Sequence, residues 1–116
     1  MFTIYHNPRC SKSRQTLALL EGQAQKENQE IHIVEYLKIP LTHDNIRQLL
    51  VQLDCSALSM MRVKEAEFSK QNLKGANEET LIDAMANTPK LVERPIVTNG
   101  SKAIIGRPPE NVLDFF

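Results

Sequence analysis

Cys10 lies in a short segment whose residue types suit a reactive thiol. The segment is HNPRCSKSR, residues 6–14, and it brings Arg9, Lys12 and Arg14 close to the sulfur in sequence. The thiolate is the nucleophilic form of cysteine, and a helix N-terminus or nearby cations lower the thiol pKa from about 8.5. The N–H groups of a helix start also bind oxyanions. The segment therefore predicts a nucleophilic Cys10 that reacts with an anion.

Three further arginines, far apart in the sequence, could bind that anion. Arg62 ends SMMR, Arg94 lies in ERPIV and Arg107 lies in GRPPE. Proline follows the second and third of these and restricts the backbone before it. Strand ends and the first strand-to-helix turn can meet at one edge of a sheet, so we expect the three arginines to converge on Cys10. Their planar, bidentate donors match oxyanions and offset the repulsion between an oxyanion and a thiolate.

Other roles are open to cysteine and its neighbours. We expect Cys55 to pack as a small apolar residue, because it lies in an apolar stretch without basic residues. Two cysteines and three scattered histidines match no zinc spacing, and a structural disulfide is unusual in a cytosolic protein. Two positions stay open. His6 is either a core histidine at a strand end or a hydrogen-bond partner of Cys10, and Ser13 is either a helix cap or a hydroxyl donor.

Length and composition predict one ordinary domain, residues 1–116. Hydrophobic residues make up 41% of the chain and charged residues 24%. The net charge is zero, which argues against a general nucleic-acid binder. No apolar run is long enough for a membrane helix, and the N-terminus lacks the pattern of a signal peptide. We expect a cytoplasmic protein with neither a membrane nor a nucleic-acid partner.

The first 36 residues predict the unit that positions Cys10. Residues 2–5 and 31–36 are β-prone and read as strands. A helix lies between them, with Ser11 or Ser13 as its cap, and the polar stretch 23–30 ends it. A strand, a helix and a strand at this spacing predict a right-handed βαβ unit with parallel strands.

The rest of the chain predicts several helices and then a hairpin. Helical patterns cover 43–53 (capped by Thr42), 56–62, 64–73 and 78–88. Asn99-Gly100, between short β runs at 96–98 and 102–105, predicts a type I′ turn, and a last helix covers 109–116. This order matches a thioredoxin-like (glutaredoxin-like) fold. Its four-stranded mixed sheet would carry a helical insertion, at approximately 40–90, between βαβ and ββα halves.

Several motifs together resemble one enzyme family. TIYHNPRCSKSR, MMRVKEAEF, LIDAMANTPKLVERPIV and GRPPENVLDFF are similar to segments of the arsenate reductases that couple to glutathione and glutaredoxin. The resemblance covers essentially the whole chain. It implies a thioredoxin-like fold, a Cys10 nucleophile and an oxyanion-binding triad of Arg62, Arg94 and Arg107. It also implies supporting roles for four further residues: His6 and Ser13 beside the thiolate, Arg14 in the same motif, and Pro95, which matches a proline that is usually cis.

The resemblance implies that arsenate forms an adduct with the Cys10 thiolate. Glutathione then attacks the adduct, and glutaredoxin resolves it. No tightly bound cofactor is expected, and glutathione is a co-substrate. Two alternatives stay open: a non-enzymatic redox regulator of the same fold, and a glutathione-dependent thiol-transfer enzyme without arsenate activity. The serine at position 13 removes the CxxC disulfide that a local redox sensor needs, and a glutathionyl carrier has little need for three convergent arginines.

Overall fold

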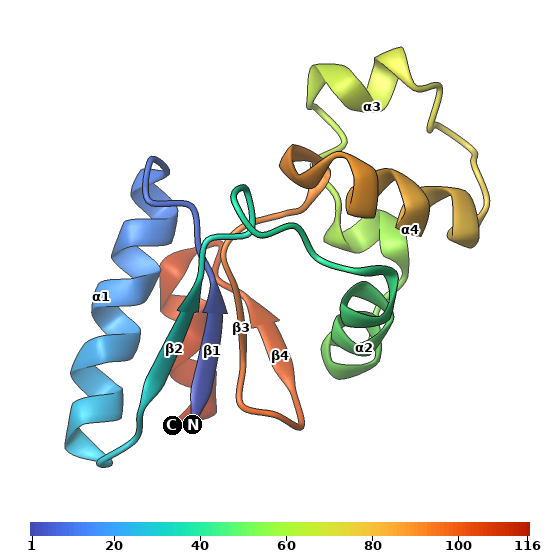
Figure 1. Ribbon diagram of the computed structural model, residues 1–116. Helices are drawn as coiled ribbons and strands as arrows, with labels where there is room; N and C mark the ends of the chain where they lie inside the picture. Colours follow the sequence, from blue (N-terminus) through green and yellow to red (C-terminus); the bar gives the residue numbers. More distant parts are fainter.

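The computed structural model describes all residues 1–116 and contains one four-stranded sheet (Figure 1). Its strands are β1 Phe2–Tyr5, β2 Ile31–Val34, β3 Ile96–Thr98 and β4 Ala103–Ile105, in the order β2-β1-β3-β4. β1 is parallel to β2 and antiparallel to β3, and β3 is antiparallel to β4. This arrangement confirms the predicted mixed sheet, with a βαβ half and a ββα half.

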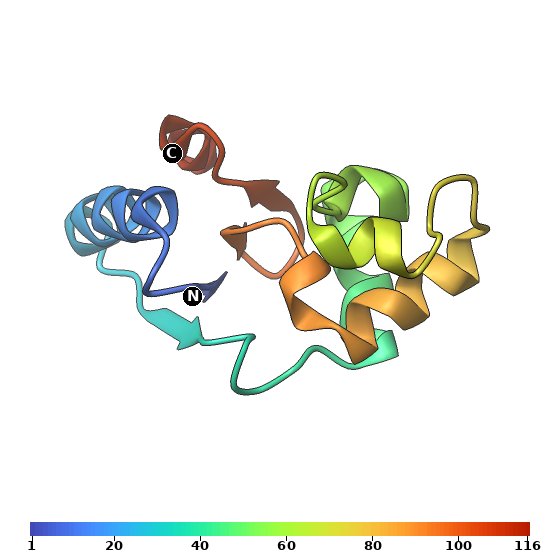
Figure 2. The same cartoon turned by 90° about the horizontal axis from the view of Figure 1, so that it is seen from above.

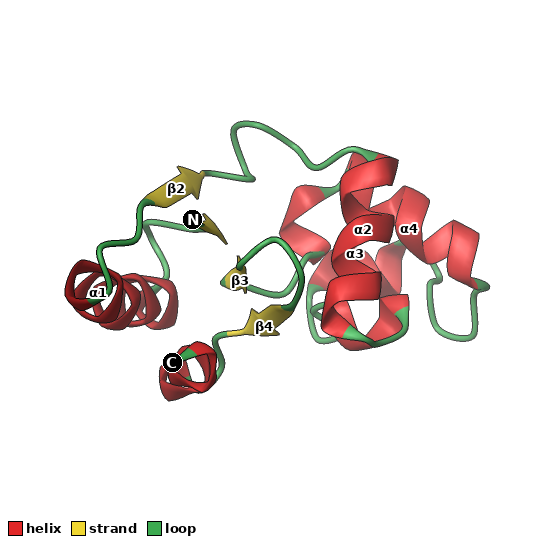
Figure 3. Cartoon of the chain, turned by 90° about the horizontal axis from the view of Figure 1, so that it is seen from below, coloured by secondary structure: helices red, strands yellow, loops and turns green.

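Helices lie on both sides of the sheet. The α-helices are α1 Ser11–Lys26, α2 His43–Leu53, α3 Ala66–Lys70 and α4 Glu78–Asn87, and the 3₁₀ helices are η1 Ala57–Met60, η2 Pro89–Leu91 and η3 Pro109–Phe115. α1 and η3 pack together over one face, whereas α2, α3 and α4 form a separate group beside β4 (Figures 2 and 3). None of these helices combines the length and the apolar character that crossing a membrane requires.

Side chains that alternate along the strands divide the core into two clusters. Successive strand residues point to opposite faces of a sheet. Ile4 and Val97 join α1 and η3 in a buried cluster of six residues. Their neighbour Ile96 faces the other way, into a cluster of 18 buried residues that the helices between β2 and β3 dominate. The sheet therefore separates a small hydrophobic core on one face from a large one on the other.

Local capping signals explain why the helical group begins where the sequence predicts. Thr42 is the N-cap of α2, and its hydroxyl accepts a hydrogen bond from the Asn45 N–H while the Asn45 side chain accepts from the Thr42 N–H. The Asn77 side chain caps α4 through a single hydrogen bond, which it accepts from the Thr80 N–H. The apolar stripe of α4, including Met85, is buried as predicted.

Several predicted elements differ from the structure in length or in helix type. β2 ends at Val34 rather than at residue 36, so that Tyr36 leaves the strand and is buried among the helices. The helix predicted over 64–73 is reduced to α3. The final helix is 3₁₀ throughout, from Pro109 to Phe115.

Two predictions about local geometry are wrong. Neither Ser11 nor Ser13 caps α1, because Cys10 itself is the N-cap, and α1 continues through the first polar residues of 23–30. The turn at Asn99-Gly100 is not type I′, which needs positive φ at both central residues, because only Gly100 has it. The Asn99 side chain instead accepts hydrogen bonds from the N–H groups of Ser101 and Lys102 and closes a wider loop.

Candidate active site

Cys10 is held at the start of α1 by a tight turn after β1. The Cys10 N–H donates to the Asn7 carbonyl over 3.0 Å, and the Asn7 side chain accepts from the Arg9 N–H over 3.0 Å. The backbone of Cys10 is extended, as is usual for an N-cap. The sulfur is therefore placed at the N-terminal end of a 16-residue helix, where N–H groups have no intrahelical acceptor.

The surroundings of Cys10 favour its thiolate. Partial burial raises the pKa of the Cys10 thiol, but the Ser13 N–H, the charge of Arg94, the Lys12 N–H and a hydrogen bond from Arg94 together lower it below its usual value. This is the direction that the sequence predicts. Cys55 shows the opposite behaviour, since burial and then the charges of Glu78 and Asp54 raise its pKa.

His6 and Ser13 form a buried pair within the Cys10 turn. His6 Nδ1 and Ser13 Oγ are 2.6 Å apart, and the Asn7 N–H donates to the same Oγ over 3.0 Å. Burial is the main cause that lowers the pKa of His6. The pair makes no hydrogen bond to the Cys10 sulfur. His6 is thus a core histidine at the end of β1, and the Ser13 side chain joins the turn to the helix.

Arg94 and Arg107 are neighbours because β3 and β4 pair. Arg94 precedes β3 and Arg107 follows β4, and the register joins Ile96 to Ile105. The Gly106 N–H donates to the Pro95 carbonyl over 2.9 Å and extends this pairing to the edge of the sheet. Both arginines precede cis prolines, and the Arg94-Pro95 bond is cis as the resemblance implies.

Gly106 packs tightly against α1. A Cβ at Gly106 would lie 2.6 Å from Thr16 Cγ2 and 3.1 Å from Pro95 Cγ. The buried Thr16 hydroxyl lies 3.1 Å from the Gly106 carbonyl and 2.9 Å from the Lys12 carbonyl. The helix that carries Cys10 is therefore in direct contact with the segment that carries Arg107.

Arg62 reaches the site from the helical group. Met61 and Val92 form an antiparallel bridge, in which the Arg62 N–H donates to the Leu91 carbonyl and the Glu93 N–H donates to the Met60 carbonyl, both over 2.8 Å. This bridge places Arg62 alongside the segment that leads to Arg94. All three predicted anion-binding arginines line one cavity of about 320 Å³.

Two carboxylates that sequence reasoning missed lie among these arginines. Glu93 Oε1 is 3.1 Å from Arg94 Nη1 and 3.8 Å from Arg107 Nε, and Glu65 Oε2 is 3.4 Å from Arg62 Nη1. Both glutamates line the same cavity. The available signal was their spacing in the sequence, since Glu93 directly precedes Arg94 and Glu65 follows Arg62 by three residues. Such pairs orient guanidinium groups and reduce the net positive charge.

Arg14 and Tyr36 do not line the arginine cavity. Arg14 Nη1 donates to the Pro8 carbonyl over 2.9 Å. Tyr36, only 1% exposed, was not predicted. Burial raises the pKa of Tyr36 to about 12, against the opposing charges of Arg94 and Arg62. Tyr36 therefore belongs to the large core, within reach of the charges of Arg94 and Arg62, whereas Arg14 holds the Cys10 turn.

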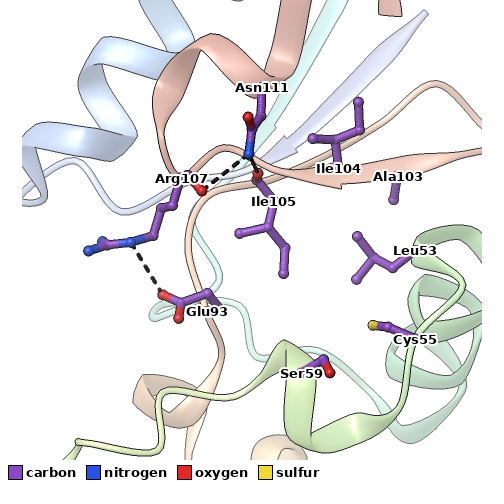
Figure 4. Close-up of a pocket in the computed structure, with 9 residues that line it drawn as sticks. All are labelled: Leu53, Cys55, Ser59, Glu93, Ala103, Ile104, Ile105, Arg107 and Asn111. Atoms are coloured by element: carbon purple, nitrogen blue, oxygen red, sulfur yellow. Dashed lines mark hydrogen bonds and ion pairs between the residues drawn. The ribbon is translucent and has the colours of Figure 1, made fainter. Parts of the chain in front are cut away.

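A larger cavity of about 470 Å³ adjoins the first (Figure 4). Leu53, Cys55 and Ser59 lie on its helical side, and Ile105 and Asn111 lie on its sheet side. Glu93 and Arg107 line both cavities and form the boundary between them. No group of three or more His, Cys, Asp or Glu side chains is arranged to hold a metal ion.

Comparisons with known proteins point to one family. A sequence model of the ArsC family matches residues 5–115. The chain is 51% identical to the Escherichia coli protein YfgD over 115 residues, 96% of this chain and 92% of that one. It is 39% identical over 113 residues to the arsenate reductase of Haemophilus influenzae, with 96% of this chain and 95% of the relative covered. The solved structure of arsenate reductase from Vibrio cholerae superposes with a TM-score of 0.91 at 42% identity, covering 99% of this chain and 97% of that one.

Proposed function

Because this chain belongs to the ArsC family, we propose that it reduces arsenate to arsenite with Cys10 as the nucleophile. The observation that carries the proposal is the position of Arg94. It shares a cavity with Arg62 and Arg107, and its charge lowers the pKa of the Cys10 thiol. An oxyanion bound by these arginines lies next to a thiol whose pKa is already lowered, which is the arrangement that nucleophilic attack requires.

The first step is a displacement at arsenic. The Cys10 thiolate forms an S–As bond, an As–O bond breaks, and the departing oxygen leaves as water after it takes up protons. Arsenic stays in the +5 state in this step. The arginines neutralise the charge of the oxyanion, and the helix start stabilises the attacking sulfur.

The reduction itself needs two electrons from outside the chain. Two external thiols supply them and become a disulfide, while arsenic passes from +5 to +3. Water then cleaves the S–As bond, which releases arsenite and restores the Cys10 thiol. Cys55 is a poor resolving thiol, because its pKa is raised and it packs against the large core. Glutathione is the proposed first thiol and glutaredoxin the second. Both operate in the cytoplasm, where thiols are kept reduced.

The two competing functions lack a comparable observation. A regulator of the same fold that senses oxidants needs a second cysteine beside Cys10, and that position is Ser13. A thiol-transfer enzyme without arsenate activity does not explain three arginines around one cavity.

The test is arsenate-dependent oxidation of NADPH in the presence of glutathione, glutathione reductase and glutaredoxin. We expect turnover by the full chain and none by Cys10→Ser. Cys55→Ser is the matched control, since it removes the other thiol, and it should retain turnover. Equal rates for the parent chain and Cys10→Ser would overturn the proposal.

A further inference from the structure

Glu93 places a negative charge inside a cavity that is otherwise suited to anions. A carboxylate at such a position repels a bound oxyanion unless the oxyanion offers it a hydrogen. We propose that Glu93 is a specificity-determining residue that makes the arginine cavity select oxyanions carrying a proton, such as hydrogenarsenate or hydrogenphosphate, over fully deprotonated oxyanions such as sulfate. The proposal rests on the anion-binding part of the proposed function.

The two oxygens of Glu93 have different partners. Oε1 accepts from Arg94 Nη1 over 3.1 Å and from the Arg94 N–H over 3.3 Å, and it forms the 3.8 Å ion pair with Arg107. Oε2 has no hydrogen-bond partner in the chain. Because Glu93 lines the cavity together with the three arginines, this oxygen can accept a hydrogen bond from a bound ligand.

Glu65 lines the same cavity, but each of its oxygens lies within ion-pair distance of a cation. Its Oε2 pairs with Arg62 over 3.4 Å, and its Oε1 lies 4.0 Å from Lys90 Nζ. Both oxygens therefore face cations. Of the two carboxylates in the cavity, Glu93 is the one with an oxygen that forms no ion pair within the chain.

Arg94 also has an unused donor. Its side chain is only 15% exposed, and its buried Nε has no hydrogen-bond partner. Buried donors without an acceptor are unfavourable, and a small shift of the Arg94 side chain toward an oxyanion in the cavity would satisfy this one. An unused donor on Arg94 beside an unused acceptor on Glu93 matches a ligand that has both bare oxygens and a hydroxyl group.

The discrimination follows from hydrogen-bond chemistry. Hydrogenphosphate and sulfate are tetrahedral dianions of similar size, and they differ in that the first has a hydroxyl group and the second does not. Against Glu93 Oε2, the hydroxyl donates, whereas a sulfate oxygen meets the carboxylate lone pairs directly. A hydrogen bond that involves a charged group, set against this repulsion, corresponds to a preference of about tenfold or more.

The experiment measures binding of these two anions to the full chain. Sodium phosphate and sodium sulfate are titrated separately into the reduced protein by calorimetry, at neutral pH and constant ionic strength. Neither anion is reduced by thiols, so the measurement does not depend on turnover. We expect phosphate to bind about tenfold more tightly than sulfate. Equal affinities, or no binding of either anion, would overturn the proposal.

The variant Glu93→Gln keeps the size of the side chain and replaces the carboxylate by an amide that can donate to sulfate. We expect the ratio of the two affinities to fall toward one, mainly because sulfate binds more tightly. Glu65→Gln is the matched control, because it removes the same charge from the same cavity and should leave the ratio unchanged. If the ratio persists in Glu93→Gln, or falls equally in Glu65→Gln, the assignment to Glu93 is wrong.

Two further measurements complete the test. If Glu93→Gln fails to fold, as circular dichroism would reveal, Glu93→Ser takes its place with the same expected fall in the ratio. Arsenate turnover is assayed separately on the parent chain. A phosphate preference without turnover would support the role of Glu93 while rejecting the reductase function, and turnover without a phosphate preference would do the reverse.

Discussion

The sheet region and the helical region contribute to the candidate site in different ways. The sheet region, made of β1, α1, β2, β3, β4 and η3, carries Cys10, Arg94 and Arg107 around a cluster of six buried apolar residues. The helical region, from α2 to η2, carries Arg62 and forms most of a cluster of 18. The smaller core thus supports the nucleophile, and the larger core supports one anion-binding side chain.

The two regions control different properties of the site, namely the reactivity of Cys10 and the position of Arg62. The reactivity of Cys10 depends on the start of α1 and on Arg94, both in the sheet region. The position of Arg62 depends on the packing of helices and on the bridge between Met61 and Val92. Changes in the helical region should therefore weaken anion binding and leave the thiol pKa unchanged, whereas changes in α1 or at Arg94 should alter the pKa.

The largest expected effect comes from one truncation in each core. Leu20 and Met85 are both fully buried, the first in the small cluster and the second in the large one. Leu20→Ala and Met85→Ala should each lower the free energy of unfolding by about 2–5 kcal/mol, measured by urea denaturation. Where each variant remains folded, Leu20→Ala should raise the pKa of Cys10 and Met85→Ala should leave it unchanged. A raised pKa in Met85→Ala would remove the distinction between the regions.

The next largest effect is expected when each of the three anion-binding arginines is replaced by lysine. Lysine keeps the charge but loses the bidentate fork, so arsenate binding should weaken about tenfold or more in Arg62→Lys, Arg94→Lys and Arg107→Lys. Only Arg94→Lys should also raise the pKa of Cys10. Calorimetry measures the binding, with Arg47→Lys as the control, because Arg47 pairs with Glu79 on the surface. Parent-like binding by all four variants would show that the triad is wrong.

The pH dependence of Cys10 sharpens the comparison on the sheet side. A lowered pKa keeps the thiolate present at pH values where an ordinary thiol is protonated. The rate of alkylation by iodoacetamide should therefore level off at lower pH for Cys10, measured in Cys55→Ser, than for a model thiol. Since the folded pKa lies below the unfolded one, the ionised thiol stabilises the fold above the unfolded pKa. That stabilisation is lost as pH falls through the folded pKa. A parallel dependence of stability on pH in Cys10→Ser would contradict this.

The smallest effect is expected at Cys55. Cys55→Ser places a hydroxyl against the large core and should lower the free energy of unfolding by about 1–3 kcal/mol at most. Arsenate turnover should be unchanged, because Cys55 lies on the far side of the larger cavity from the arginines. Loss of turnover in a folded Cys55→Ser would make Cys55 a resolving thiol and connect the two regions chemically.

Sequence reasoning predicted most of what local signals determine. The cap at Thr42, the strand at 2–5 and the order of strands and helices follow from neighbouring residues, and the structure reproduces them. The convergence of Arg94 and Arg107 was also predictable, since each lies at the end of one strand of a hairpin.

What the sequence did not predict depends on contacts between distant segments. The pairing of Glu93 with Arg107 exists only because β3 and β4 are adjacent, and a lone glutamate beside an arginine resembles any surface ion pair. Serine is a common residue type at helix N-caps, but tertiary packing places the Ser13 side chain beside His6. The prediction of a type I′ turn at Asn99-Gly100 is wrong for a related reason. The Asn99 side chain accepts a hydrogen bond from the loop backbone, and the φ of Asn99 is negative.

The contact between Thr16 and Gly106 has a consequence for the entropy of binding. It joins α1 to the segment before Arg107, and the pairing of Gly106 with Pro95 extends the connection to Arg94. Cys10 and two of the three arginines that bind the anion therefore belong to one preorganised unit. The conformational entropy lost on binding comes mainly from Arg62 and its surroundings. Substitutions in the helical region can accordingly tune affinity over a wide range while the geometry of attack stays fixed.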